Sequence, residues 1–320
     1  MVSVARFIDV TPENEVVRHE VLSALAEKPK RLPCKLFYDD VGSRLFERIC
    51  ELDEYYLTRT ELGILRGCVG EVAGVAGVGC RVVEFGSGAS VKTRLLLEAL
   101  DRPASYVPID IARGALLESA AALALDYPTL DVRPVCADYT REVALPPVES
   151  GTKTLGFFPG STLGNFEPKD AVTFLRRVRG HCGPGGLLLL GVDLKKDRAT
   201  LEAAYDDREG VTAAFNTNIL RVVNRTLGAR FSLESFRHRA RYDERHGRVE
   251  MHLVSTIRQR VVVGGEVVSF EAGEAVVTEH CYKYDLDGLR GLARTSGFEP
   301  IRCFTDARDR FAVVLLGVVE

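Results

Sequence analysis

The stretch "CRVVEFGSG", residues 80–88, decides the fold. Its apolar first half has the composition of a buried strand, and it ends in Gly86 and Gly88. Glycines at the end of a strand allow a tight turn and a close approach of the backbone to a ligand. The segment that follows, "VKTRLLLEAL" (residues 91–100), has the spacing of a helix. Strand, glycine turn and helix in succession predict the first unit of an α/β sheet.

The same alternation continues along the chain. Further strands are expected at 105–111, 130–139, 154–158 and 185–194, with helices at 114–127 and 168–182. Because these strands are apolar throughout, we expect a parallel sheet that is buried on both faces. Residues 195 to about 250 are expected to be helical and are followed by antiparallel strands up to residue 284. A helix at 286–297 and two closing strands then resume the first pattern.

This order predicts one sheet domain that is interrupted by an insertion. We expect a Rossmann-like α/β sheet, mostly parallel with a closing antiparallel strand, in residues 60–194 and 282–320. The pair of strands after the last helix is also the pattern of the common methyltransferase sheet. A second, α+β domain that binds substrate is expected in residues 1–59 and 195–281.

Composition and charge exclude several classes of function. The net charge is -3, with 42 basic and 45 acidic residues and no basic run, so no nucleic-acid partner is expected. No apolar run approaches the roughly 20 residues of a membrane span, and the first residues do not resemble a signal peptide. The eight cysteines are scattered, which favours reduced thiols in a cytoplasmic protein. The six histidines show no ligand spacing with acids or cysteines, so no metal is expected.

Acidic residues at two strand ends indicate the cofactor. The dinucleotide fingerprint requires glycine where the chain has Val91, so the loop is a poor cradle for a pyrophosphate. Asp110 ends the second strand, where a carboxylate commonly binds ribose hydroxyls, and Asp138 ends the third, within reach of an adenine amino group. These features favour a nucleoside without an essential pyrophosphate, such as S-adenosylmethionine. Ordinary turn glycines are the alternative interpretation.

With these motifs together, the chain resembles the histidine-specific methyltransferases, which trimethylate the α-amino group of L-histidine toward ergothioneine. The resemblance covers nearly the whole chain. It rests on "LPCKLFYDDVGSRLFERICELDEYYLTRTE", "VEFGSGASVKT", "PGSTLGNF", "LLLGVDLKKD", "AYDDREGVTAAFNTNIL", "VEM" and "TEHCYKY".

The resemblance implies a role for each matching residue. The cofactor would be S-adenosylmethionine, leaving as S-adenosylhomocysteine, and its matching positions are Gly86, Lys92, Asp110, Asp138 and Tyr139. The positions that match the histidine site are Tyr55, Gly160, Asn165, Tyr205, Met251, Glu279 and Cys281. Tyr38 and Asn165 are the expected catalytic positions. The family often has Phe in place of Tyr139 and usually has Ser in place of Cys281. We expect a monomer whose partners are L-histidine and its methylated forms.

The sequence "TEHCYKY" (residues 278–284) also admits other chemistry. If it is a strand, Glu279 and Cys281 share one face and His280 lies on the other, so the three cannot form one metal site or thiol centre. A related enzyme acting on another amino acid, such as tryptophan, is an alternative, as is a binding protein that has lost turnover. By residue type alone, Tyr55, Tyr205 and Met251 would more commonly be core side chains.

Overall fold

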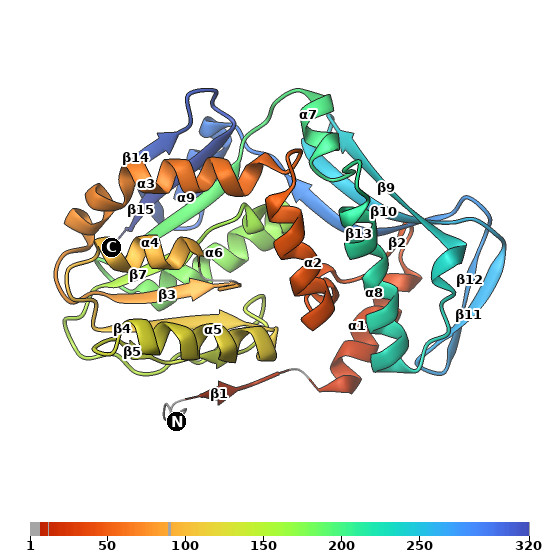
Figure 1. Ribbon diagram of the computed structural model, residues 1–320, viewed down its shortest axis with the longest axis horizontal. Helices are drawn as coiled ribbons and strands as arrows, with labels where there is room; N and C mark the ends of the chain where they lie inside the picture. The colour runs from red at the N-terminus through yellow and green to blue at the C-terminus, as the bar shows by residue number, and fades with distance from the viewer. Residues whose placement is uncertain (1–6, 12, 89–90, 320) are drawn as a thin grey trace. The chain divides into compact units, whose positions relative to one another are not determined.

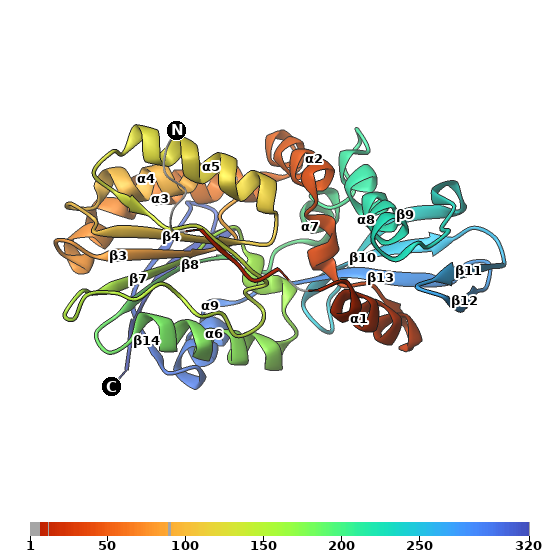
Figure 2. The same ribbon diagram turned by 90° about the horizontal axis from the view of Figure 1, so that it is seen from below.

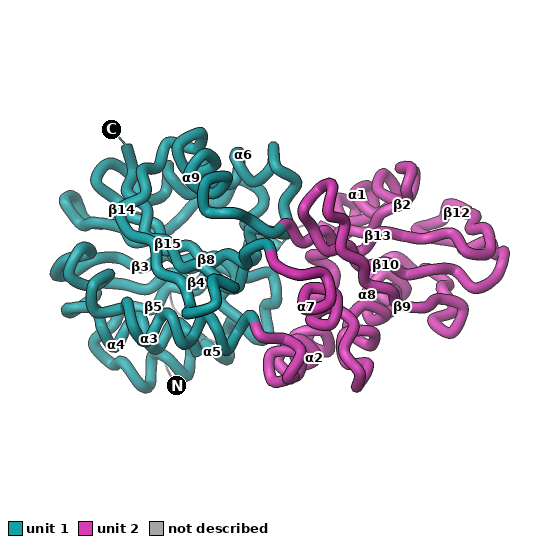
Figure 3. The backbone as a smooth tube through the Cα atoms, turned by 90° about the horizontal axis from the view of Figure 1, so that it is seen from above, with its two compact units in different colours: residues 1–11, 57–195, 283–320 teal, residues 12–56, 196–282 magenta. Residues whose placement is uncertain are grey.

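The structure, a computed structural model, describes residues 7–11, 13–88 and 91–319. It divides into two compact units (Figure 3): residues 1–11, 57–195 and 283–320 form unit 1, and residues 12–56 and 196–282 form unit 2. This division differs from the expected boundaries mainly at the start of the chain. There, β1 (Ile8–Asp9) pairs in parallel with β6 (Val135–Cys136) of unit 1.

Unit 1 is built on a sheet that has nine strands among the described residues. The strands are β1, β6, β3 (Arg81–Phe85), β4 (Ser105–Asp110), β5 (Asp131–Val132), β7 (Thr154–Phe158), β8 (Leu187–Asp193), β14 (Phe298–Thr305) and β15 (Phe311–Val318). Their order is β1-β6-β4-β3-β7-β8-β15-β14, with β5 paired to β4. All pairs are parallel up to β8, and β15 then lies antiparallel between β8 and β14. The expected methyltransferase-type α/β sheet is therefore confirmed.

Helices cover both faces of this sheet (Figure 2). One face carries α3 (Tyr56–Ala76), α4 (Val91–Ala99) and α5 (Arg113–Asp126), and the other carries α6 (Pro168–Cys182) and α9 (Leu286–Thr295). Every residue of β3, β7 and β8 is buried, as their continuous apolar sequence predicts. The segment expected as one strand at 130–139 forms two short strands instead. Pro134 lies between them and has no N–H to donate.

Unit 2 combines helices with a four-stranded sheet (Figure 1). Its sheet has the order β2-β13-β10-β9, and β11 pairs with β12 as a separate hairpin. The strands are β2 (Lys30–Arg31), β9 (Phe236–Asp243), β10 (Arg248–Ser255), β11 (Gln259–Val263), β12 (Glu266–Phe270) and β13 (Ala275–Tyr282). The helices are α1 (Asn14–Ala26), α2 (Asp40–Glu51), α7 (Arg198–Ala203) and α8 (Val211–Leu227), with 3-10 turns η1 (Cys34–Phe37) and η3 (Leu233–Ser235).

The prediction of helix up to residue 250 was wrong for β9. Its sequence, "FRHRARYD", alternates arginines with Phe236, His238, Ala240 and Tyr242, which is the period of a strand. Three arginines in eight residues gave the segment a charged composition that resembled the preceding helices. None of the helices within the described ranges is long and apolar enough to cross a membrane.

Candidate functional site

The glycine turn after β3 has the geometry that its sequence predicts. Gly86 has φ +76°, a conformation that side chains other than glycine rarely adopt, and its N–H donates to the Ile109 carbonyl over 2.8 Å. A Cβ atom on Gly86 would lie 3.6 Å from the ring of Tyr139. The turn thus brings the ends of β3 and β4 together with Tyr139, one of the expected cofactor residues.

Backbone groups hold the two strand-end carboxylates in place. Asp110 accepts hydrogen bonds from the N–H groups of Gly88 (3.2 Å) and Ala112 (2.9 Å). Burial raises the pKa of Asp110, and these backbone hydrogen bonds partly oppose the shift. Asp138 accepts from the backbone N–H of Thr140 at 3.0 Å. These backbone hydrogen bonds therefore fix the orientation of both carboxylates.

The glycine turn also contains a polar atom that suits a ligand. The hydroxyl oxygen of Ser87 is buried and has no hydrogen-bond partner among the described residues. Leaving a buried hydroxyl unsatisfied costs about 1–3 kcal/mol, so such an atom needs an explanation. It lies between Gly86 and Gly88, where the turn permits close approach of a nucleoside. This observation fits a bound S-adenosylmethionine.

The loop after β7 forms a second group within unit 1. Gly160 is followed by the 3-10 turn η2 (Thr162–Asn165), which ends at Asn165. The Lys92 ammonium lies 3.6 Å from the position that a Cβ on Gly160 would take. Both residues bind Glu61 of α3: Lys92 donates to it over 2.5 Å and the Gly160 N–H over 2.9 Å. Residues expected for cofactor and substrate thus meet at a carboxylate that the sequence analysis did not single out.

The expected substrate residues of unit 2 gather around an aromatic cluster. The Tyr205 hydroxyl and the Cys281 sulfur are 2.9 Å apart, and the rings of Tyr55 and Tyr205 are 6.2 Å apart between centroids. Phe46 links Tyr55 to Tyr38, with centroid distances of 6.2 and 5.8 Å. Burial raises the pKa of Tyr55 well above its usual value, and Tyr205 adds to the shift. Four dispersed segments thus bring their candidate residues to one place.

The face of β13 that carries Glu279 and Cys281 completes this group. Glu279 lies directly opposite Met251 in the register of β10 and β13, and both are buried. The strand conformation of β13 confirms that His280 faces the other way. Burial is the main cause that raises the pKa of the Cys34 thiol to about 12, and the negative charge of Glu279 adds to the shift. The Cys34 thiol is therefore near enough to Glu279 to be affected by its charge.

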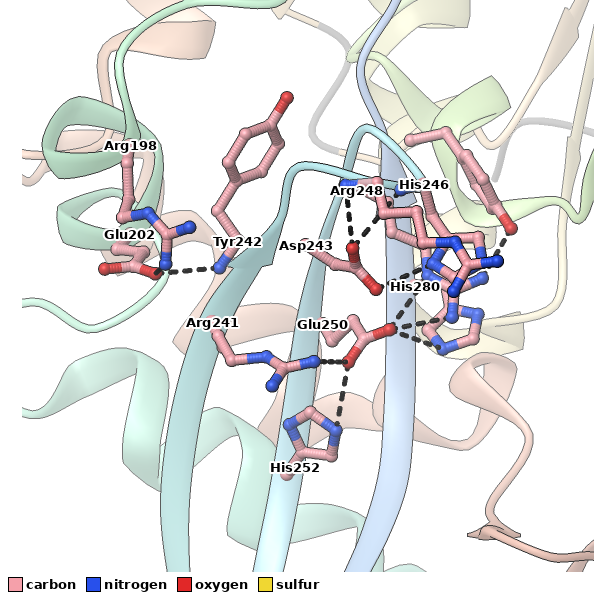
Figure 4. A network of polar contacts seen from close by, with 12 residues as sticks. Arg198, Glu202, Arg241, Tyr242, Asp243, His246, Arg248, Glu250, His252 and His280 are labelled. Carbon is pink, nitrogen blue, oxygen red and sulfur yellow. Dashed lines mark hydrogen bonds and ion pairs between the residues drawn. The ribbon is translucent and has the colours of Figure 1, made fainter.

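His280 belongs to a polar network on the opposite face of the same sheet (Figure 4). Glu250 is its centre, at 3.8 Å from His280, 3.5 Å from His252 and 3.5 Å from Arg241. Arg248 completes the network, with a 2.7 Å contact to Glu250. Within the described part of the chain, no group of three His, Cys, Asp or Glu residues could hold a metal ion.

A hydrogen-bonded chain that the sequence did not reveal fixes Tyr205. The Asn216 amide of α8 contacts His238 Nδ1 at 2.8 Å, and His238 Nε2 contacts the Tyr205 carbonyl at 2.9 Å. Burial lowers the pKa of His238, which favours the neutral ring that this chain requires. The motif around Tyr205 gave no signal for these partners, because His238 comes from β9, where a helix was expected.

Comparison with known proteins identifies the family. A profile described as histidine-specific methyltransferase, SAM-dependent, matches residues 17–318. The chain is 42% identical over 322 residues to the Histidine N-alpha-methyltransferase of Mycobacterium tuberculosis, covering 98% of each. It is 32% identical to the Ergothioneine biosynthesis protein 1 of Neurospora crassa, over 90% of this chain and 34% of the fungal protein.

A solved structure supports the fold independently of sequence. It is described as a possible exported protein from Bordetella parapertussis, has 13% identity and a TM-score of 0.50, and covers 89% of this chain and 85% of that one. At this identity the likeness concerns the fold alone. The profile match over most of the chain, the full-length bacterial relative and the glycine turn with its strand-end carboxylates agree: this chain belongs to the family of histidine-specific, S-adenosylmethionine-dependent methyltransferases.

Proposed function

We propose that this enzyme transfers methyl groups from S-adenosylmethionine to the α-amino group of L-histidine. The products are Nα-trimethylhistidine (hercynine), for ergothioneine biosynthesis, and S-adenosylhomocysteine. The observation that carries the choice of substrate is the pairing of Glu279 with Met251 on the face of the unit 2 sheet that also presents Cys281 to Tyr205. That face offers a buried carboxylate and apolar surface, which suit a ring with an N–H group.

In unit 1 we assign the cofactor to the glycine turn and its neighbours. Asp110 would bind the ribose hydroxyls, and Asp138 and Tyr139 would contact the adenine. Lys92 would bind the carboxylate end of the methionine part. When bound, S-adenosylmethionine supplies a methyl group on a sulfonium, which is already an activated leaving group. We assign Gly160 and Asn165, on the loop after β7, to the amino-acid end of the substrate.

In unit 2 we assign residues by the polarity of their surroundings. Glu279 would accept a hydrogen bond from the imidazole N–H. An apolar amino acid such as leucine has no ring N–H to donate to this carboxylate, and a site built to bind a substrate N–H discriminates against an analogue that lacks it. Tyr55 and Tyr205 would hold the amino-acid end, and Met251 and Cys281 would pack beside the ring. These side chains would therefore discriminate against apolar amino acids.

The chemistry sets two further requirements. The amine must lose a proton before it attacks, because an ammonium has no lone pair, and we assign that transfer to Tyr38 or to water. The nitrogen must then approach the methyl carbon in line with the departing sulfur. Correct positioning of reactants can lower a barrier by about 7–11 kcal/mol, which makes orientation the main contribution of the protein.

Mass spectrometry tests the proposal directly. After incubation with S-adenosylmethionine and histidine, we expect mono-, di- and trimethylated histidine, and we expect Glu279→Gln to reduce all three. Glu266→Gln, an exposed substitution on β12, is the matched control and should behave as the wild type. Tighter calorimetric binding of tryptophan than of histidine would contradict the choice of substrate. No methylated product at high enzyme concentration would favour a binding protein, and light scattering would test the expected monomer.

A further inference from the structure

Glu61 is a buried carboxylate that the proposed roles do not use. It lies on α3 and is 1% exposed, among the apolar residues Ile64, Leu65 and Cys68 of the same helix. Acidic residues are seldom buried unless they are paired, because removing a charge from water is costly. Its place in the core therefore depends on the groups that face it.

Two groups from different parts of unit 1 face this carboxylate. Lys92, in the first turn of α4, places its ammonium 2.5 Å from one carboxylate oxygen. The N–H of Gly160, on the loop after β7, lies 3.0 and 2.9 Å from the two oxygens. One carboxylate thus joins α3 to the helix behind the glycine turn and to the loop that carries the candidate substrate residues.

The neighbouring strand leaves room for Glu61. A Cβ atom on Gly191 of β8 would lie only 2.0 Å from a carboxylate oxygen of Glu61, closer than real Cβ contacts allow. Glycine is otherwise unfavourable inside a strand, where it weakens packing, and it often marks the close approach of another group. The strand therefore lacks a side chain at the one position where Glu61 enters.

We propose that Glu61 is a positioning residue for cofactor binding, which holds the Lys92 ammonium and the Gly160 backbone in a single arrangement. This inference rests on the proposed role of Lys92 toward S-adenosylmethionine. Glu61 acts through Lys92 and makes no contact with the cofactor itself. It also keeps the loop of Gly160 in register with the glycine turn.

Two effects of removing the charge oppose each other. In Glu61→Gln the side-chain oxygen can still accept from Gly160, but the amide NH2 group faces the Lys92 ammonium and displaces it. The loss of a negative charge would, by itself, strengthen the binding of the anionic carboxylate of the cofactor. If Glu61 positions Lys92, the first effect dominates and affinity falls. If Glu61 only competes for Lys92, affinity rises.

Calorimetry with S-adenosylhomocysteine on the full chain distinguishes these cases. We expect Glu61→Gln to weaken binding at least about tenfold, the effect of losing one charge-assisted hydrogen bond. Lys92→Met should weaken it by at least as much, and the double variant should bind no more weakly than Lys92→Met. Glu71→Gln is the matched control, because Glu71 lies on the same helix as Glu61 but forms an exposed ion pair with Arg302. This variant should bind as the wild type.

Glu61→Asp provides a second test that keeps the buried charge. It shortens the reach by one methylene, so its affinity should lie between those of the wild type and Glu61→Gln. Unchanged or tighter binding by Glu61→Gln, or losses that add in the double variant, would overturn the inference while the wild type still binds the ligand. Failure of the wild type to bind S-adenosylhomocysteine would instead overturn the proposed cofactor role of Lys92, and the inference with it.

Discussion

A buried ion pair in unit 1 gives the sharpest test of how this fold is stabilised. The Lys283 ammonium lies 2.8 Å from the Asp193 carboxylate, and both side chains are 0% exposed. Asp193 ends β8, and Lys283 follows β13 beside the bridge between Leu194 and Tyr284. Replacing Lys283 by Met would leave a charged carboxylate in the core without its cation.

The geometry sets the size of the effect. Two unit charges 2.8 Å apart attract by about 6 kcal/mol at an effective dielectric constant of about 20. Removing one partner of a buried ion pair costs about 3–5 kcal/mol in measured cases. This is less than the full attraction because the removed side chain no longer has to be desolvated on folding. We therefore expect Lys283→Met to lower the free energy of unfolding by about 3–5 kcal/mol, which corresponds to roughly 10 °C in the melting temperature of a unit of this size.

Circular dichroism during thermal and urea unfolding measures this loss. Lys195→Met is the matched control, because Lys195 pairs with Asp285 at 2.7 Å with both side chains about half exposed. An exposed pair contributes at most about 1 kcal/mol. Adding Asp193→Leu to Lys283→Met should restore most of the stability, since it removes the buried negative charge that Lys283 balances. The reasoning fails if Lys283→Met costs no more than Lys195→Met, or if the double variant remains as unstable as the single one.

Three further outcomes are expected. Burial raises the pKa of Glu84 to about 8. The stability that this carboxyl contributes is therefore present below its unfolded pKa near 4.5 and is lost as pH rises through 8. In urea unfolding, the stability of Glu84→Gln relative to the wild type should increase as pH rises. Burial lowers the pKa of His252 to about 4, so the stability that this side chain contributes is present above about pH 6.5 and is lost as pH falls toward 4. His252→Gln should therefore unfold less readily than the wild type in acid. Cys281→Ser should keep histidine methylation with unchanged or tighter binding, since a hydroxyl is a stronger hydrogen-bond partner than a thiol, and a large loss would show a role for the sulfur.

The large sheet was predictable because its local signals agree. Strands β3 and β8 are buried apolar runs of suitable length, and β3 is followed by the glycine turn and then by helix α4. The segment 236–243 was not predictable in the same way. Its outward positions are arginines, and the alternation that identifies a strand was obscured by a composition shared with the helices before it.

The residues of the candidate sites also differ in how far the sequence could predict their placement. The two-residue period of a strand was sufficient to place Glu279 and Cys281 on one face and His280 on the other, and β13 confirms this placement. Glu61 could not be found in this way. Its partners Lys92 and Gly160 lie 31 and 99 residues away along the chain, and nothing in the helical pattern of α3 indicates a buried acid. Pairings at that distance exist only once the fold has brought the segments together.

The loop after β7 shows why these distant charges matter. Gly160 and Ser161 have φ +83° and +60°, and a left-handed conformation costs a residue other than glycine about 1–2 kcal/mol. Each is held by a different buried group: the Gly160 N–H donates to Glu61, and the Ser161 hydroxyl accepts from the N–H of Asp193, at 2.9 Å. Asp193 is in turn held by Lys283. Glu61 and the backbone of Asp193 thus hold the two left-handed residues of the loop that ends at Asn165, and the carboxylates of these two acids are paired with Lys92 and Lys283.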